Sequence, residues 1–336
     1  MRIGLIDCDN TSFPNLALMK LSAYHKERGD EVEWYMPFSQ RYDRVYVSKV
    51  FSTSADYDEV INAKEVFRGG TGYEISVIDG KEVYTPTHNN LPYDIEHTYP
   101  DYSLYRIKDT AYGYLTRGCP RGCDFCIVGK KEGRSSIKVA DLSEFWRGQK
   151  NIVLLDPNIL ACREAVGLLH QLSESKAYVD FNQGLDIRLM TQEKAELIKA
   201  CKIKEIHFAW DKYADRDIIL TRLEQFSKWV GVKRHGHYAI VYVLVNFDTT
   251  FEQDLERIYA LRDIGYWPYV MIYNKAHCAQ KYKDLQRWCN NYPIRSSTTT
   301  PAPNSGCNKR NQLIKPITNE SKRIPRESDG NVYAVV

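Results

Sequence analysis

The sequence of 336 residues contains no apolar run that approaches the roughly 18 residues needed to cross a bilayer. Its start, MRIGLIDCDN, lacks the basic head and the apolar stretch of a secretory signal peptide. The net charge of +3 is small for a chain of this length, so charge alone gives no argument for a nucleic-acid-binding surface. We therefore expect a cytoplasmic protein with no membrane partner.

The chain also lacks the paired CxxC motifs that hold a structural zinc ion, although it contains nine cysteines. In a reducing compartment, an odd number of cysteines favours metal ligands or buried thiols over disulfides. Cys162 and Cys201 lie in apolar, helix-like segments and are expected to be buried thiols. Irregular gaps separate Cys278, Cys289 and Cys307, which argues against an auxiliary cluster at these three positions.

Three cysteines, Cys119, Cys123 and Cys126, lie close together in the segment TRGCPRGCDFCIVGK. A 4Fe-4S cluster is usually held by four cysteine thiolates, so three thiolates on one loop leave one iron with an open position. Zinc is the alternative, but no second cysteine pair or nearby histidine supplies its fourth ligand. The spacing predicts a 4Fe-4S cluster, and Phe125 is expected to shield one of its faces from water.

This CxxxCxxC motif, with an aromatic residue before the last cysteine, resembles the signature of the radical S-adenosylmethionine (SAM) superfamily. The resemblance implies that the open iron chelates the amino and carboxylate groups of SAM. It further implies reductive cleavage of SAM to a 5′-deoxyadenosyl radical, which abstracts hydrogen from a substrate. A reducing electron donor such as flavodoxin or ferredoxin is an implied partner. The substrate, whether a small molecule, a peptide or a nucleic acid, is left open.

Over residues 111–290, short apolar runs alternate with helical segments, as in parallel strands joined by crossover helices. The predicted strands are 112–115, 152–155, 178–181, 205–210, 239–245 and 269–273. The predicted helices are 142–147, 163–173, 192–200, 215–230, 251–264 and 281–290. Six such units suit an open barrel or a doubly wound sheet. The resemblance favours the first, an α/β fold with a partial six-stranded β/α barrel of the radical SAM type.

Residues 1–95 begin with a strand, an amphipathic helix and a second strand, which predicts a small N-terminal Rossmann-like α/β domain. Residues 96–110 are predicted to form a connector. Residues 291–336, with seven Lys or Arg and three Asp or Glu, predict a C-terminal tail that is disordered or draped on the barrel. The N-terminal domain faintly resembles that of cobalamin-type radical SAM proteins. No Asp-x-His-x-x-Gly motif occurs, so no cobalamin is expected.

Two short motifs in the N-terminal part predict turns. Asp79 and Gly80 separate two strand-like runs and predict the tight turn of a hairpin. Gly69, Gly70 and Gly72 are interpreted as a turn and not as a phosphate-binding loop, because no strand clearly leads into them and no helix cap follows.

Polar residues follow the predicted strands at their carboxyl ends, where barrels and doubly wound sheets bind ligands. By the resemblance, such positions hold the amino group, ribose and adenine of SAM. The candidate SAM contacts are Phe125, Asp156, Asn158, Asn182, Gln183, Asp186, Arg188, Asp211, Asn246, Asp248 and Asn274. Capping of the following helix is the alternative for Asp156 and Asp248. The second strand lacks the Gly-Gly-Glu often seen in the family.

Two functions of other classes remain as alternatives. A non-catalytic iron-sulfur or metal-binding module would bind metal without cleaving SAM. A nucleic-acid-binding protein with a basic tail would show an affinity that falls steeply with salt.

Overall fold

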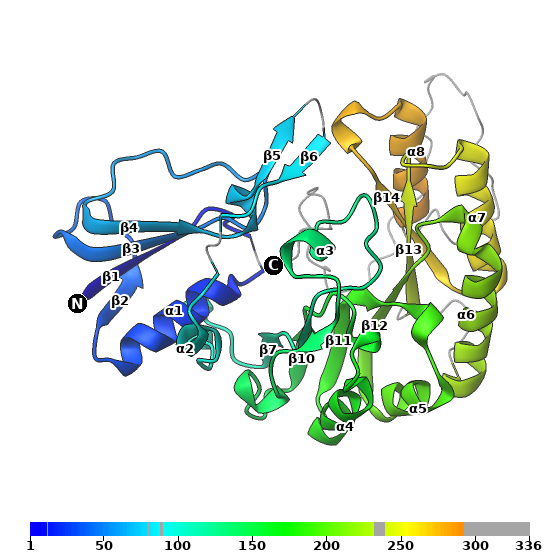
Figure 1. The fold of residues 1–336 in the computed structure, drawn as a ribbon, viewed down its shortest axis with the longest axis horizontal. Coiled ribbons are helices and arrows are strands. Elements are labelled where there is room, and N and C mark those ends of the chain that lie inside the picture. Colours follow the sequence, from blue (N-terminus) through cyan, green and yellow to red (C-terminus); the bar gives the residue numbers. More distant parts are fainter. Residues whose placement is uncertain (12, 79–80, 88–89, 232–238, 292–336) are drawn as a thin grey trace, which may run out of the picture.

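The computed structural model describes the chain except for residues 12, 79–80, 88–89, 232–238 and 292–336 (Figure 1). The protein is a mixed α/β protein with one parallel sheet of four strands and another of six. In the described residues, no helix is long and apolar enough to cross a membrane. The predicted tail lies outside the described residues from position 292 onward, as does Cys307.

The four-stranded sheet has the order β2-β1-β3-β4, and its strands are parallel. Its elements are β1 (Arg2–Asp7), α1 (Leu16–Glu27), β2 (Glu31–Trp34), β3 (Tyr42–Ser48) and β4 (Ala63–Gly69). Asn15 starts α1 because its side chain accepts a hydrogen bond from Leu18 N at 3.1 Å. The predicted β-α-β start is confirmed. The edge strand β4 was not predicted, since its exposed residues show no alternation of apolar and polar side chains.

The strands that flank the first predicted turn and the whole of the second turn lie within the described residues. β5 (Ile75–Ile78) and β6 (Lys81–Tyr84) pair antiparallel, which confirms the hairpin, although its turn residues 79–80 lie outside the described residues. After β4 the chain turns at Gly70, which has a φ of +101°. A Cβ atom on Gly70 would lie 2.3 Å from the carbonyl oxygen of Lys49, so the turn requires glycine there.

The six-stranded sheet has the order β14-β13-β12-β11-β10-β7, with all neighbours parallel. Its strands are β7 (Thr110–Gly113), β10 (Asn151–Leu154), β11 (Tyr178–Leu185), β12 (Lys202–Ala209), β13 (Ala239–Val245) and β14 (Trp267–Ile272). All six predicted strands are therefore present. Five predicted helices are also present, as α4 (Ala165–Ser175), α5 (Gln192–Ala200), α6 (Arg216–Val230), α7 (Phe251–Asp263) and α8 (Gln280–Asn290).

Two predicted elements differ from the structure. The expected helix at 142–147 is only a single 3-10 turn, η3 (Leu142–Glu144), because the backbone leaves the helical conformation at Phe145, which has a φ of −134°. The third strand continues to Leu185, past its predicted end at 181, through an irregular register with β12. Asn182 and Gln183 thus lie within β11 and not in the loop after it.

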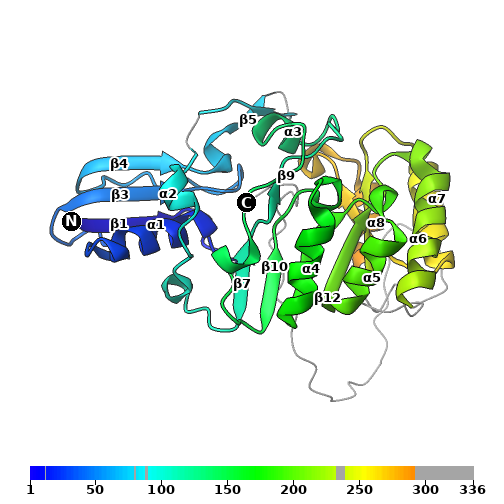
Figure 2. The same ribbon diagram turned by 60° about the horizontal axis from the view of Figure 1, so that its bottom comes forward.

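The helices follow the strands in sequence order, and same-handed crossovers place them on one face of the sheet. Figures 1 and 2 show α4, α5, α6 and α7 along that side. Alternate strand residues pack against the helices and are fully buried, namely Ile152, Val179, Phe208, Val241 and Val270. The opposite face of the six-stranded sheet is called the inner face below.

Candidate metal centre

The three cysteines lie on one loop, between β8 (Thr116–Arg117) and α3 (Val128–Lys131), just after β7. The loop starts at Gly118, whose φ is +84° and whose added Cβ atom would lie 2.2 Å from the carbonyl oxygen of Ser135. Cys119 N then donates a hydrogen bond to Gly133 O at 3.1 Å. The cysteine loop therefore packs so closely on residues 133–135 that only glycine fits at its start.

Asp156 anchors the base of this loop. The residue is 4% exposed, and its carboxylate accepts hydrogen bonds from Leu115 N at 3.1 Å, Thr116 N at 2.6 Å and Thr116 Oγ1 at 2.6 Å. Burial raises the pKa of Asp156 to about 6, although these donors oppose the shift. Asp156 was predicted to contact SAM or to cap a helix. In the structure it holds the backbone that leads into the cysteine loop.

Asn158 lies directly against the first cysteine. Its side-chain Nδ2 donates to Cys119 Sγ at 3.4 Å, and the residue is 3% exposed. Ser136 Oγ donates to the Asn158 carbonyl oxygen at 2.8 Å and so fixes the backbone of Asn158. The side-chain Oδ1 atom is buried and makes no hydrogen bond within the described part of the chain. The Oδ1 atom of Asn158 is thus available as a hydrogen-bond acceptor beside the cysteines.

The three thiols share one environment. Burial raises the pKa of Cys126 to about 12, and the neighbouring Cys123 and Cys119 add to the shift. Burial and the carboxylate of Asp211 also raise the pKa of Cys123, against the opposing charges of Lys212 and Arg188. Thiolates are the donors that iron-sulfur clusters require, so this set of donors fits such a cluster. As the side chains stand, however, no group of three or more His, Cys, Asp or Glu in the described residues is arranged to hold a metal ion.

Arginine side chains tie the cysteine loop to the end of β11. Arg121 Nε of the loop donates to Asp186 Oδ2, and Arg188 Nε donates to Asp186 Oδ1 at 2.7 Å. Burial alone would raise the pKa of Asp186, but Arg188 and Arg121 outweigh it and lower the pKa. Two predicted residues, Asp186 and Arg188, are therefore brought to the loop, where they form ion pairs.

An aromatic cluster lies on the other side of the loop. The ring of Phe125 meets the ring of Phe247 edge to face at 5.4 Å, and Phe247 meets Tyr273 at 4.8 Å. Phe247 follows β13 and Tyr273 follows β14, so three separate segments contribute. Asn246 Nδ2 donates to Tyr273 O at 2.9 Å and fixes the two strand ends together. All three residues are half-buried, and their ring contacts join the loop to the ends of β13 and β14.

The other predicted SAM contacts differ from one another in their positions. Asp211 lies close enough to Cys123 to raise its pKa, whereas Asp248 is exposed after β13. Asn274 follows β14 with a φ of +49°. Asn182 and Gln183 are half-buried in β11. The structure thus brings Phe125, Asn158, Asp186, Arg188 and Asp211 to the cysteine loop directly.

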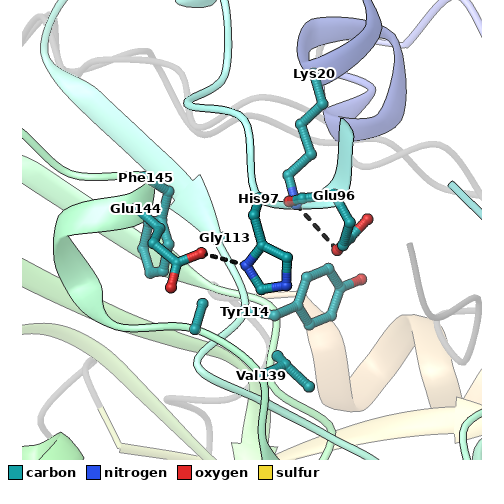
Figure 3. A pocket seen from close by; sticks show the side chains of 9 residues that line it. Lys20, Glu96, His97, Gly113, Tyr114, Val139, Glu144 and Phe145 are labelled. Atoms are coloured by element: carbon teal, nitrogen blue, oxygen red, sulfur yellow. Dashed lines mark hydrogen bonds and ion pairs between the residues drawn. The ribbon is translucent and has the colours of Figure 1, made fainter. Parts of the chain in front are cut away.

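Charged residues link α1 to the same loop, and Figure 3 shows the first contact of this series, between Lys20 and Glu96. Lys20 Nζ of α1 donates to Glu96 Oε1 at 3.0 Å, in α2 (Tyr93–Glu96), and Arg117 Nη2 donates to the same oxygen at 3.4 Å. Arg117 Nη1 also donates to Glu132 Oε1 at 3.0 Å, and Glu132 Oε2 accepts from Gly118 N at 3.1 Å. A continuous chain of contacts therefore runs from α1 to the residue before Cys119.

A small cavity of about 20 Å³ lies beside this chain, between α1, the connector and the six-stranded sheet. Its lining includes Lys20, Glu96, Tyr114 and a hydrogen-bonded pair, His97 Nδ1 and Glu144 Oε2, 2.6 Å apart (Figure 3). Such a volume holds about one water molecule and no larger ligand.

No protein-family model matches this chain, and no curated protein matches it.

Sequence reasoning missed several residues that the fold brings together. Glu96, Arg117 and Glu132 were not singled out, because isolated charges in very short elements and at their ends carry no periodic signal. Asp180 and His207 were also missed, although each interrupts an apolar strand, in YVDF and IHFA, at a position that faces away from the helices. A buried ionisable side chain at such a position is the signal that identifies them.

Proposed function

We propose that the chain is a radical SAM enzyme with a partial β/α barrel. The observation that carries the proposal is the CxxxCxxC loop, which follows the first strand of a six-stranded parallel sheet. In barrels and open α/β sheets, ligands bind at the carboxyl ends of the strands, which is where this loop lies. The glycine-dependent path of the loop and its anchoring by Asp156 and Glu132 support a precisely positioned site.

Cys119, Cys123 and Cys126 would hold three irons of a 4Fe-4S cluster and leave the fourth iron for SAM. When bound, the cluster supplies the electron that cleaves SAM reductively, with flavodoxin or ferredoxin as the donor. Asn158 donates a hydrogen bond to the first thiolate, and the Phe125 cluster joins the loop to the ends of β13 and β14. Arg121 and Arg188, paired with Asp186, hold the loop against β11.

The test is anaerobic reconstitution with iron and sulfide, reduction with SAM present, and detection of 5′-deoxyadenosine. We expect Cys119→Ala, Cys123→Ala and Cys126→Ala each to abolish the cluster signal in electron paramagnetic resonance and the release of 5′-deoxyadenosine. The matched controls are Cys162→Ala and Cys201→Ala, whose thiols are buried in the core and remote from the loop in sequence.

Two outcomes would contradict the proposal. A triple Cys119/Cys123/Cys126→Ala variant that still carries about four irons per chain would place the cluster elsewhere. A wild-type protein that binds iron but never cleaves SAM under reduction would be a non-catalytic iron-sulfur module.

A further inference from the structure

The inner face of the six-stranded sheet carries a row of tyrosines with one carboxylate and one imidazole. Val179, Phe208 and Val241 point to the helices, so Asp180, His207 and Tyr242 point the other way. Val153 is paired with Tyr112 on one neighbouring strand and with Asp180 on the other, and Tyr242 is paired with Tyr269. The row formed by Tyr112, Asp180, His207, Tyr242 and Tyr269, called the inner row below, therefore crosses the sheet.

Contacts join four members of the inner row, from Asp180 through His207 and Tyr242 to Tyr269. His207 Nδ1 lies 3.9 Å from Asp180 Oδ1. The imidazole of His207 stacks on the ring of Tyr242, with centroids 5.1 Å apart and planes at 4°, and Tyr242 meets Tyr269 edge to face at 5.7 Å. Burial raises the pKa of Tyr112, and the nearby Asp180 carboxylate adds to the shift.

This row is unusual for the interior face of a parallel sheet. Such strands are normally hydrophobic on both faces, and a buried carboxylate is costly unless it is paired. Asp180 is 9% exposed and His207 is 5% exposed, so the carboxylate and the imidazole have both been moved out of water. The three tyrosines, in contrast, are only half-buried, so their rings are accessible in part. Packing alone gives no reason to place a carboxylate here.

The chemistry of the inner row suits a cation. The faces of tyrosine rings and a carboxylate both carry negative potential, which attracts ammonium and guanidinium groups. A basic side chain already lies over a tyrosine at the start of this sheet, since Lys202 Nζ is 5.6 Å from the ring centroid of Tyr178. We propose that the inner row binds a cationic group, an ammonium or guanidinium, of the substrate. The identification of this ligand as a substrate rests on the proposed function, whereas the cation site does not.

The spacing along the strands also limits the size of such a ligand. His207 lies four residues before Asp211, whose carboxylate is near Cys123. Tyr269 likewise lies four residues before Tyr273, which belongs to the Phe125 cluster. At about 3.3 Å per residue, the inner row lies roughly 13 Å from the cysteine loop. The ligand is therefore elongated, with its cation at the inner row and its reacting end toward the cysteines.

The experiment titrates the full-length protein with N-acetyl-arginine amide and N-acetyl-lysine amide by isothermal titration calorimetry. N-acetyl-citrulline amide and N-acetyl-norleucine amide serve as neutral counterparts. We expect the charged probes to bind and the neutral ones to bind at least about tenfold more weakly, since the neutral probes lose the hydrogen bond between a charged group and the carboxylate. Saturating SAM is included in a parallel series, because SAM is itself a cation.

Variants separate the contributions of charge and ring. Asp180→Asn should weaken binding of the charged probes by about 10- to 100-fold. Tyr242→Leu should weaken it by about 2- to 30-fold, whereas Tyr242→Phe keeps the ring and should change it little. Tyr93→Leu is the matched control, since Tyr93 is 79% exposed on α2. Circular dichroism confirms that each variant is folded.

Equal binding of charged and neutral probes, absence of binding by both charged probes, or an unchanged affinity in folded Asp180→Asn would overturn the inference. Preferential binding of adenosine without any effect of Asp180→Asn would assign the inner row to nucleobase stacking. The titrations are repeated with the Cys119/Cys123/Cys126→Ala variant, which cannot form the proposed cluster. Binding of the charged probes to this variant supports the cation site even if SAM cleavage is never observed. The two proposals can therefore be contradicted independently of each other.

Discussion

The side-chain amide of Asn158 donates a hydrogen bond to the sulfur of Cys119 across 3.4 Å. The two residues are 39 positions apart in sequence and belong to the loops after neighbouring strands, β10 and β7. Hydrogen bonds to sulfur stabilise the more negative, reduced state of an iron-sulfur cluster and so raise its reduction potential. Asn158 is thus placed to tune the proposed cluster without being one of its ligands.

Replacing Asn158 by leucine tests this role. The Asn158→Leu variant should retain iron, because the thiols remain, but its reduction potential should become more negative. Redox titration monitored by electron paramagnetic resonance measures the change. Asn151→Leu, at the amino end of the same strand, is the control and should leave the potential unchanged. An unaltered potential in Asn158→Leu would show that the hydrogen bond does not act on the cluster.

The start of the cysteine loop depends on Gly118. Gly118 and Gly133 both have positive φ values, of +84° and +97°, so alanine at either position costs about 1 kcal/mol in backbone strain. Only at Gly118 would the added Cβ also collide, at 2.2 Å from Ser135 O, whereas nothing lies within 4 Å at Gly133. Gly118→Ala should therefore lose iron with unchanged circular dichroism, and Gly133→Ala should retain it. Equal iron content in both variants would be inconsistent with this close packing.

The contact between Lys20 and Glu96 should depend on pH. Burial would raise the pKa of Glu96, but the charges of Lys20 and Arg117 outweigh it and lower the pKa below the ordinary value of 4.5. Because the folded pKa is lowered, the stabilisation is present above pH 4.5 and is lost as the pH falls through the folded pKa. Glu96→Gln should cost about 1.5–3 kcal/mol near neutral pH.

Thermal unfolding at a series of pH values measures this dependence. The difference in melting temperature between wild type and Glu96→Gln should shrink as the pH falls into the acid range. Glu65→Gln removes an exposed ion pair with Arg44 and should have little effect at any pH. A difference for Glu96→Gln that persists in acid would mean that its charge is not the source of the stabilisation.

Arg257 joins the carboxyl ends of β12 and β13 from a fully buried position. It donates to Trp210 O and Leu244 O, both at 2.6 Å, and pairs with Asp254 at 2.5 Å with neither side chain exposed. Arg257→Met leaves Asp254 buried and unpaired, so the free energy of unfolding should fall by about 3–5 kcal/mol. Urea denaturation measures this loss.

The control for Arg257 is Arg216→Met, which removes a half-exposed pair with Glu256 and should cost at most about 1 kcal/mol. A similar loss in both variants would mean that burial of the Arg257 pair is not what makes it important.

Local patterns in the sequence determined the elements of the fold. Short apolar runs predicted the six strands. The predicted start of a helix at residue 251 is confirmed by the capping box of α7, where Gln253 N donates to Thr250 Oγ1 at 3.3 Å. The spacing of Cys119, Cys123 and Cys126 likewise placed them on one loop after a strand. These features depend on residues only a few positions apart, so they are encoded locally.

Only the tertiary structure decided which side chains meet. Asp156 binds the backbone at Thr116, Arg121 pairs with Asp186, and Asp180 joins Tyr242 through His207 across neighbouring strands. These partners lie tens of residues apart, and their meeting depends on sheet register, such as the irregular pairing of β11 with β12. A shift of one residue in register would send Asp180, His207 or Tyr242 to the opposite face of the sheet, which is why no local pattern could predict their contacts.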